Sequence, residues 1–396
     1  MGGIYNIFER IAKRKIFTPE ALWLELFVSF VLGVAFVSFA VQVLNFFIPI
    51  YAPLSLVFLF VGFGLFVWRY AWVLREWRVY LSGLFAFLFV GILSLHHDSY
   101  GDSVNYHIQI VTWIQNSPLI FGLGNVHGRL GFNGLIYNFY AITDVSRIFP
   151  QIRSFIGNEI VYFILMFSAF LLILTRSAHA SAPTLTHTES KGFFSATLKL
   201  TEHKSTLFVL LSIIPFPFIV QWGEFRGLYC EGIGAVLGIL VVTLVLYAFE
   251  SKARSQADTP NTLSAPHTSS IPHALDKAHA PLDSKSAQQA TTGHIFILGF
   301  CVALFGALVK IANTGLFAVI IVGFVYVYKR AVLDRSFLRV YVVLGIFSIL
   351  YALPWALKGY MTSGMIAYPA GVGYIESLSW AVSNAQREGE VCWIMS

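Results

Sequence analysis

Long apolar runs, separated by shorter polar stretches, make up most of this chain. Windows of about 18 or more apolar residues recur, and a helix of that length crosses roughly 30 Å of hydrocarbon. Backbone groups in lipid must be satisfied within the structure, and the period-two alternation of barrel strands is absent from the sequence, so we expect helical spans. The pattern predicts an all-α, polytopic transmembrane bundle of about nine spans. They are expected at residues 22–45, 53–71, 79–95, 159–175, 205–222, 232–249, 294–309, 313–328 and 337–357.

The composition agrees with a bilayer environment and excludes an ordinary soluble domain. Hydrophobic residues make up 57% of the chain and charged residues 12%, and the mean hydropathy is +0.72. Soluble domains carry roughly a quarter charged residues. The net charge of +6 comes mostly from loops predicted to be cytoplasmic, where orientation and anionic lipid explain it, so no nucleic-acid partner is expected.

Segments rich in Lys and Arg alternate with segments that hold few, as the positive-inside rule requires. The rule places the N-terminus in the cytoplasm and the large loop 96–158 on the outer face. Few ionisable residues fall deep inside a span, which favours a site at the membrane surface over an ion-coupled transporter. Charged residues distant in sequence are then expected together on the outer face: Asp98, Asp102, Glu224, Arg226, Glu231, Lys310 and Lys358.

Polar linkers divide the chain into three membrane regions. Residues 176–204 and 251–293 are rich in Ser, Thr, Ala, Pro and His, and we expect disordered cytoplasmic linkers there. They separate an N-terminal membrane region (1–175), a membrane hairpin (205–250) and a C-terminal membrane region with an outer loop (294–396). The histidine spacings in these linkers match no metal-binding motif.

The three cysteines define no disulfide framework. Cys230 and Cys392 share the predicted outer face, where a disulfide is permitted, but nothing in the sequence requires one.

The segment 96–133 is a long polar and aromatic stretch between two apolar helices. It holds Asp98 and Asp102, and the run after Asp102 keeps helical spacing, which puts Asp102 and Tyr106 at i and i+4. Apolar residues recur along the same run, so we expect a short amphipathic helix along the membrane surface. A carboxylate at this boundary could take a proton from an acceptor hydroxyl or hold a divalent cation. Helix capping by either aspartate is the structural alternative.

The tail of that segment, GLGNVHGRLGFN (122–133), is rich in glycine but is no nucleotide-binding loop. It follows no hydrophobic strand and ends in no Lys-Ser or Lys-Thr pair. Its glycines would let backbone amides approach an anion, and Arg129 could bind a phosphate through two hydrogen bonds. A tight turn before a helix that begins near Phe132 is the alternative.

Two lysines are expected where helices leave the membrane. Lys310 follows the apolar run FILGFCVALFGALV, where it would either extend its ammonium to the interface or contact a phosphate below the headgroups. Lys358 lies in PWALKGYMTSGMIAYP (354–369), which we interpret as an ordered interfacial loop with Lys358 at the helix exit.

Three segments resemble a known group of proteins. DSVNYHIQIVTWI (102–114) places an acidic residue four positions before Tyr106 and five before His107. This is similar to the juxtamembrane motif of GT-C-fold glycosyltransferases, which include protein O-mannosyltransferases and the aminoarabinose transferases of lipid A. Together with GLGNVHGRLGFN and PWALKGYMTSGMIAYP, the segment looks more closely like a group of bacterial multi-spanning proteins of unassigned activity related to that superfamily. The resemblance covers residues 79–375 apart from the two linkers.

The resemblance implies transfer of a sugar from a polyprenyl-phosphate donor to a glycan, lipid or protein acceptor, on the outer face of a bacterial inner membrane. Asp102 would be the base, and Asp98 would be an alternative base or metal ligand, so a divalent cation stays open as a cofactor. Offsetting the donor phosphate charge would accelerate the reaction electrostatically. The implied substrate and phosphate contacts are Tyr106, His107, His127, Arg129, Lys310 and Lys358.

The chain departs from the GT-C pattern in two respects. Two spans precede the one that leads into the loop 96–158, whereas GT-C enzymes commonly place that loop after the first. Glu224 and Glu231 stand where the narrower group usually carries an aspartate. The sequence also predicts no helix before its end at VCWIMS, which leaves truncation open. A lipid-linked glycan transporter or flippase, and a non-catalytic assembly protein of cell-envelope biogenesis, are the alternative functions.

Overall fold

A computed structural model of the 396-residue chain describes residues 16–17, 21–95, 103–144, 146, 156–180, 204–213, 230–257, 284–329, 332 and 335–395. Within these ranges the fold is all-α, and the β structure there amounts to an isolated bridge between Ala367 and Val372. The α-helices are α2 (Leu22–Asn45), α3 (Ala52–Tyr70), α4 (Trp77–Leu95), α5 (Ile108–Asn116), α6 (Ile136–Thr143), α7 (Gly157–Ala180), α9 (Lys204–Ile213), α11 (Cys230–Ala257), α12 (Ser284–Val309), α13 (Gly315–Tyr328), α14 (Arg335–Ser363) and α15 (Asn384–Met395).

The described part of the chain contains 8 helices that are long and apolar enough to cross a membrane. They confirm the prediction of a multi-pass helical bundle. The ninth span, expected at 205–222, is described as far as Ile213, where α9 forms a short apolar helix. Its remainder lies outside the described residues.

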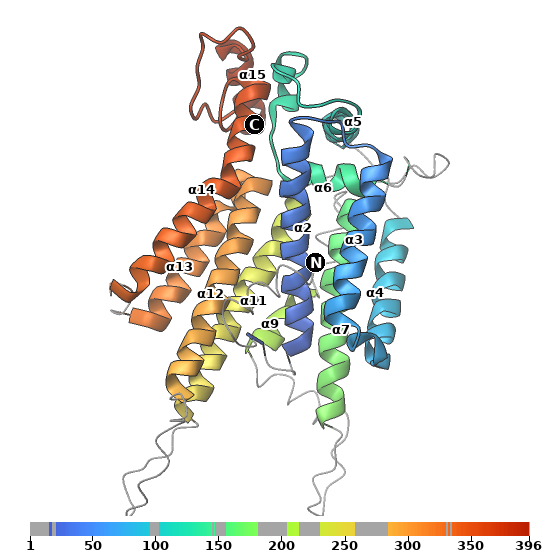
Figure 1. The fold of residues 1–396 in the computed structure, drawn as a ribbon, viewed down its shortest axis with the longest axis vertical. Helices are drawn as coiled ribbons and strands as arrows, with labels where there is room; N and C mark the ends of the chain where they lie inside the picture. The colour runs from blue at the N-terminus through green and yellow to red at the C-terminus, as the bar shows by residue number, and fades with distance from the viewer. Residues whose placement is uncertain are drawn as a thin grey trace, which may run out of the picture.

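The long helices run side by side, with α2 near the centre of the bundle (Figure 1). Leu24, Phe27 and Val28 of α2 are fully buried. By contrast, α3, α4, α13 and α14 lie on the flanks and expose large apolar side chains such as Phe60 and Val322. A continuous apolar surface of this kind needs lipid to cover it.

The helices on either side of the linkers are longer than the sequence predicts. α7 continues to Ala180, α11 continues to Ala257, and α12 begins at Ser284. The predicted linkers 176–204 and 251–293 therefore include helical residues at their edges. Their central parts, 181–203 and 258–283, lie outside the described residues.

α14 also extends beyond its predicted end at residue 357, to Ser363. It contains Pro354, which has no N–H to donate and therefore weakens the helix locally. α14 bends along its length: its upper part runs beside the upper end of α2, and its lower part diverges from the bundle (Figure 1). Near Pro354 the helix is tied to α2 by Tyr351, whose hydroxyl donates to the carbonyl of Ala35 at 2.8 Å.

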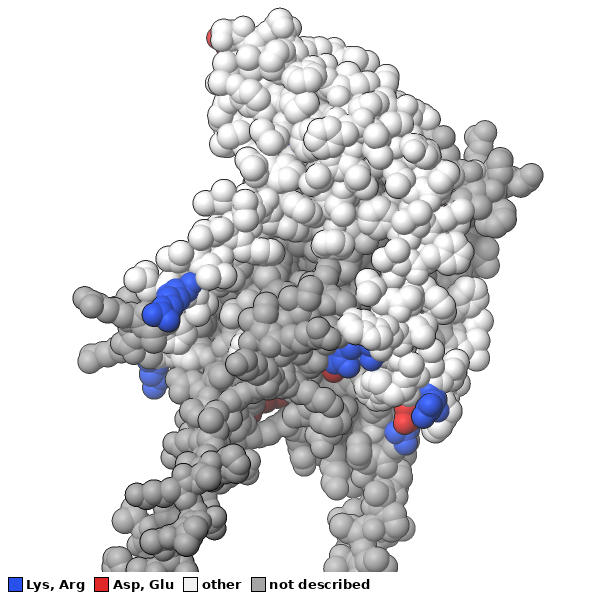
Figure 2. All heavy atoms as spheres, in the orientation of Figure 1, with Lys and Arg blue, Asp and Glu red and all other residues white. Residues whose placement is uncertain are grey.

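Basic residues mark one end of the bundle. On the face shown in Figure 2, Lys and Arg side chains lie toward the end opposite α15, while the described surface near α15 is mostly uncharged. At the basic end, Arg69 of α3 forms an ion pair with Glu25 of α2 at 2.9 Å. Glu25 also accepts a hydrogen bond from the Tyr70 hydroxyl, as expected of an acid near the end of a span.

Candidate functional site

The opposite end of the bundle carries α5 and α15 (Figure 1). α5 is seen end-on there, so it lies across the direction of the long helices, as the sequence predicts for an interfacial helix. Val111 and Ile114 face the bundle and are buried. The side-chain amide of Asn45, at the end of α2, donates to the carbonyls of Ile114 at 3.1 Å and Ser117 at 3.0 Å. These bonds fix the end of α5 to α2.

The residues just before α5 form a π-helical turn, Ser103–His107. π turns are rare and often lie at functional sites. The α-helical i, i+4 spacing assumed from the sequence does not apply inside this turn, so the expectation of one regular helix is wrong for residues 103–107. Tyr106 and His107 are both buried, and their ring centroids lie 4.2 Å apart. Asp98 and Asp102, the predicted catalytic residues, lie outside the described residues.

The glycine-rich segment folds as two short 3-10 turns, Leu123–Asn125 and Gly128–Gly131. Gly122, which precedes the first, has φ 68°, a left-handed conformation that favours glycine. Phe132 is extended, and the next helix begins at Ile136, so the expected helix start near Phe132 is wrong.

Arg129, in the second 3-10 turn, lies close to two aromatic rings from other segments. Its Cζ is 5.1 Å from the ring centroid of Tyr106 and 3.4 Å from that of Trp393. Its Nε lies 3.5 Å from a carboxylate oxygen of Glu390, and its backbone N–H donates to Nδ1 of His127 at 3.3 Å. These contacts orient the guanidinium and pair it with the Glu390 carboxylate.

An open polar pocket of about 440 Å³ surrounds this arginine. Asn105, His127 and Arg129 line it from one side, and Glu390 and Trp393 of α15 line it from the other. His127 and Arg129 were predicted as phosphate contacts from the resemblance, whereas the contribution of α15 was not predicted.

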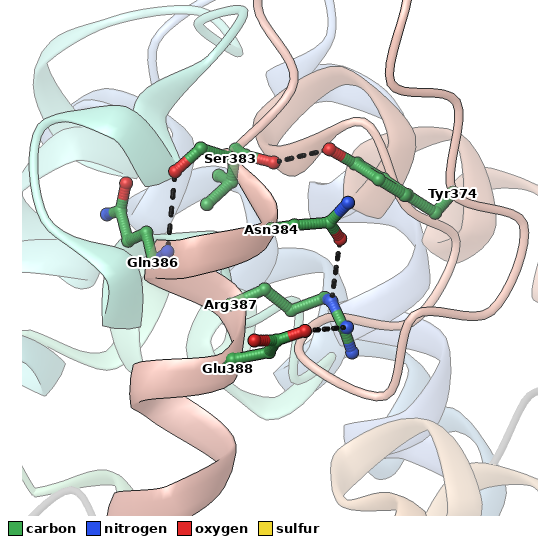
Figure 3. A network of polar contacts seen from close by, with 7 residues as sticks. Tyr374, Ser383, Asn384, Gln386, Arg387 and Glu388 are labelled. Carbon is green, nitrogen blue, oxygen red and sulfur yellow. Dashed lines mark hydrogen bonds and ion pairs between the residues drawn. The ribbon is translucent and has the colours of Figure 1, made fainter.

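α15 is secured to the preceding loop by the polar contacts shown in Figure 3. The backbone N–H of Gln386 donates to the Ser383 hydroxyl at 3.3 Å, and the Tyr374 hydroxyl donates to the Val382 carbonyl at 3.1 Å. The Gln386 side chain donates to the carbonyl of Gly124 at 3.0 Å, which ties α15 to the glycine-rich segment. Ser383 and Gln386 have the S-x-x-Q spacing of a capping box, a sequence signal that could have located this helix.

The three segments that carry the family resemblance meet at this end of the bundle. Phe132 packs against Tyr106 and Tyr368, with ring centroids 5.7 and 5.8 Å away. The buried amide of Asn133 donates to the carbonyls of Trp355 at 3.0 Å and Ile366 at 3.1 Å. Residues 122–133 therefore join the start of α5 to the end of α14.

Lys310 lies at the end of α12, as predicted, but it does not line the pocket around Arg129. Its ammonium forms an ion pair with Glu231 at the start of α11, and both side chains are substantially exposed. The backbone N–H of Leu135 donates to the Leu308 carbonyl at 2.9 Å, so the chain from Arg129 to α6 passes beside this helix end. Glu224 and Arg226 lie outside the described residues.

Lys358 occupies a different environment from the one predicted. Because α14 continues to Ser363, Lys358 lies inside the helix and is 4% exposed. Its Nζ has no hydrogen-bond partner among the described residues. The cavity it lines, together with Asn45 and Ile110, holds about 20 Å³, enough for one water molecule but not for a phosphate.

α6 carries two buried tyrosines, Tyr137 and Tyr140, and Tyr137 lies beside His107. The Tyr137 ring is 5.3 Å from the His107 ring, and its hydroxyl is 3.6 Å from Sγ of Cys230. Burial raises the pKa of both Tyr137 and Tyr140 well above its ordinary value. Both phenols are therefore neutral hydrogen-bonding groups at physiological pH, which rules them out as general bases.

The described residues contain no group of three His, Cys, Asp or Glu side chains placed to hold a metal ion. Asp98 and Asp102, the predicted ligands, lie outside the described residues. The three cysteines are free: Cys230 and Cys301 are buried, and Cys392 is exposed on α15.

Residues 6–185 match a family described as a domain of unknown function, DUF8201. No curated protein and no solved structure matches the chain. The matched part includes Tyr106, His107, His127 and Arg129, whereas α12, α14 and α15 lie beyond it. The similarity therefore assigns no chemistry to the chain.

Proposed function

We propose that this protein is a GT-C-type membrane glycosyltransferase that uses a polyprenyl-phosphate sugar donor. The observation that carries the proposal is the convergence of the three resembling segments around Arg129, Phe132 and Asn133. The first two of these segments and α15 line one polar pocket at one end of an apolar bundle. A lipid-linked donor and a water-soluble acceptor group would meet at such a boundary.

Arg129 is the proposed contact for the donor phosphate. An arginine can bind a phosphate through two parallel hydrogen bonds, and stacking on aromatic rings orients the guanidinium in advance. In this structure the Glu390 carboxylate occupies that position, 3.5 Å from Nε. A donor phosphate would take its place, so binding would displace Glu390 from Arg129.

Lys310 is a second cation for the same donor. It projects from the end of α12 beside the residues that follow Arg129, and its partner Glu231 is partly exposed to solvent. An exposed ion pair of this kind is worth about 0–1 kcal/mol, so a phosphate can replace the carboxylate at small cost. Lys358, in its 20 Å³ cavity, is assigned no phosphate contact.

Asp102 directly precedes the π turn that holds Tyr106 and His107, and the family resemblance makes it the catalytic base. The acceptor hydroxyl would attack the anomeric carbon, its proton would pass to the Asp102 carboxylate, and the bond from that carbon to the phosphate oxygen would break. The polyprenyl phosphate leaves with the electron pair. Positioning of the two substrates and stabilisation of the leaving phosphate by Arg129 and Lys310 would lower the barrier.

The distribution of charge supports an outer location for this site. Arg69, Arg75 and Arg78 lie at the opposite end of the bundle, where α3 ends and α4 begins. The positive-inside rule assigns such an end to the cytoplasm. We therefore place the pocket at the outer face of a bacterial inner membrane.

Complementation of a deletion strain tests the proposal. We expect the deletion strain to lose a surface glycan. The wild-type chain should restore this glycan and Asp102→Asn should not, at equal membrane levels of both proteins. The variant Asp98→Asn, measured in the same way, shows which of the two aspartates is required for transfer. Full restoration by Asp102→Asn would rule out Asp102 as the base, and an unchanged glycan profile in the deletion strain would contradict the proposed function.

A further inference from the structure

A second large cavity lies far from the Arg129 pocket, between α12, α13 and α14. It has a volume of about 690 Å³, within the roughly 300–1,000 Å³ typical of ligand sites. Its wall is mainly apolar and includes the aromatic side chains of Phe296, Phe324, Tyr328, Phe337 and Tyr341. We call it the α12–α14 groove.

The groove opens toward the membrane-facing flank of the bundle. Ile321 and Val325 line it and are 57% and 47% exposed. None of the described residues that line it is acidic. The lower part of α14, which diverges from the bundle in Figure 1, forms its outer wall. A lipid chain in the bilayer could therefore enter from the side.

Two cations stand at one end of the groove. Lys329 follows the lining residue Tyr328, and Arg339 precedes the lining residue Val340. Both are exposed, and neither has a polar partner among the described side chains. Figure 2 shows Lys and Arg side chains where α13 ends and α14 begins, with no described acidic side chain beside them on that face.

The backbone conformation is unusual at this end of the groove. Lys329 has φ 50°, and it is the one non-glycine residue with positive φ in the described chain. Such conformations cost on the order of 1–3 kcal/mol and are enriched at ligand-binding positions. Lys252 of α11 donates to the carbonyl of Val327, which braces the last turn of α13 from behind.

We propose that the α12–α14 groove binds an anionic glycerophospholipid, with an acyl chain against the aromatic wall and the phosphate at Lys329 and Arg339. The apolar groove matches the acyl chain, and the two cations, which have no acidic partner among the described side chains, match the headgroup. This pairing favours an anionic lipid over a second copy of the protein, because an apolar helix would leave both charges without a partner. The site is independent of the proposed transferase activity.

Lipid binding to the purified full-length protein tests the site. After delipidation in detergent, phosphatidylglycerol and phosphatidylcholine with the same acyl chains are added separately, and bound lipid is counted by native mass spectrometry. Phosphatidylglycerol should bind more tightly by at least on the order of tenfold, with a larger rise in Tm. Lys329→Gln combined with Arg339→Gln should remove that preference. Arg75→Gln combined with Arg78→Gln, which also removes two positive charges at the same end of the bundle, should leave it intact.

A second pair of variants tests the chain-binding part. Gly345 lines the groove, and a Cβ there would meet no atom within 4 Å, so Gly345→Phe fills the groove without a backbone clash. Gly64 of α3 has equally open surroundings and does not line the groove, which makes Gly64→Phe the control. Loss of bound lipid in Gly345→Phe alone supports the site. Equal binding of the two lipids to the wild-type protein, or unchanged lipid binding in Gly345→Phe, would overturn the proposed lipid site. A dimer that cross-links through α14 and is abolished by Gly345→Phe would also overturn it.

Discussion

The guanidinium of Arg129 lies over the indole of Trp393, with Cζ 3.4 Å from the ring centroid. The contact joins the glycine-rich segment to α15 and makes the C-terminal helix part of the candidate site. Cation–π contacts contribute about 0.5–2 kcal/mol, with the lower values at exposed sites, and Trp393 is 54% exposed. α15 is therefore held to Arg129 by contacts that a ligand could displace.

Arg129→Gln should reduce sugar transfer by about 100-fold or more, because a neutral amide cannot offset the charge of the donor phosphate. Arg129→Lys should retain part of the activity, since it keeps the charge but loses bidentate binding and planar stacking. Transfer from a polyprenyl-phosphate sugar in proteoliposomes measures both. Arg387→Gln is the control, because its guanidinium contacts Asn384 and Glu388 instead. Equal losses for Arg387→Gln and Arg129→Gln would show that the effect is only structural.

Glu390→Gln should lower the KM for the donor several-fold, because it removes the carboxylate that competes with the phosphate for Arg129. Glu388→Gln removes the same charge from the same helix, but that residue pairs with Arg387, so its KM should stay at the wild-type value. Steady-state kinetics with varied donor concentration distinguishes the two. A higher KM in Glu390→Gln would mean that Glu390 positions Arg129 for binding.

Exchanging the charges of Lys310 and Glu231 separates stability from function. The double variant Lys310→Glu, Glu231→Lys keeps an ion pair between two partly exposed side chains, so its Tm should remain close to wild type. Transfer should fall about tenfold or more if Lys310 itself faces the donor phosphate. Wild-type transfer by the exchanged pair would assign Lys310 a purely structural role.

Lys358→Met should stabilise the protein by about 1–3 kcal/mol, because the ammonium is buried without a partner among the described residues and methionine has a similar shape. Thermal unfolding in detergent measures the change. Lys358→Gln, which keeps a polar group at the same place, should give a smaller gain. Destabilisation by Lys358→Met would indicate that the ammonium pairs with a carboxylate outside the described residues.

The spans could be predicted from the sequence because long apolar runs suffice to define a membrane helix. Lys358 could not be placed in this way, since the helix continues past residue 357 through residues with no strong apolar pattern. α15 was missed for a similar reason: its first seven residues, NAQREGE, are mostly polar, its apolar run is short, and its position depends on contacts with Gly124 and Arg129.

The local conformation before α6 depends on tertiary contacts that the sequence does not display. Phe132 is extended rather than helical because its ring packs between Tyr106 and Tyr368, while the adjacent Asn133 bonds to two carbonyls of the C-terminal region. The proximity of Tyr106, His107, His127 and Arg129 was nevertheless predictable, because they occur together in one polar stretch of an otherwise apolar chain.

The Asn45 amide, which bonds to the carbonyls of Ile114 and Ser117, couples α5 to the tilt of α2. Transmembrane helices tilt when the hydrocarbon thickness of the bilayer departs from their apolar length. A change in thickness would thus reorient α5 and carry Tyr106 and His107 with it. Membrane composition thereby becomes a physical variable that acts on the geometry at this end of the bundle.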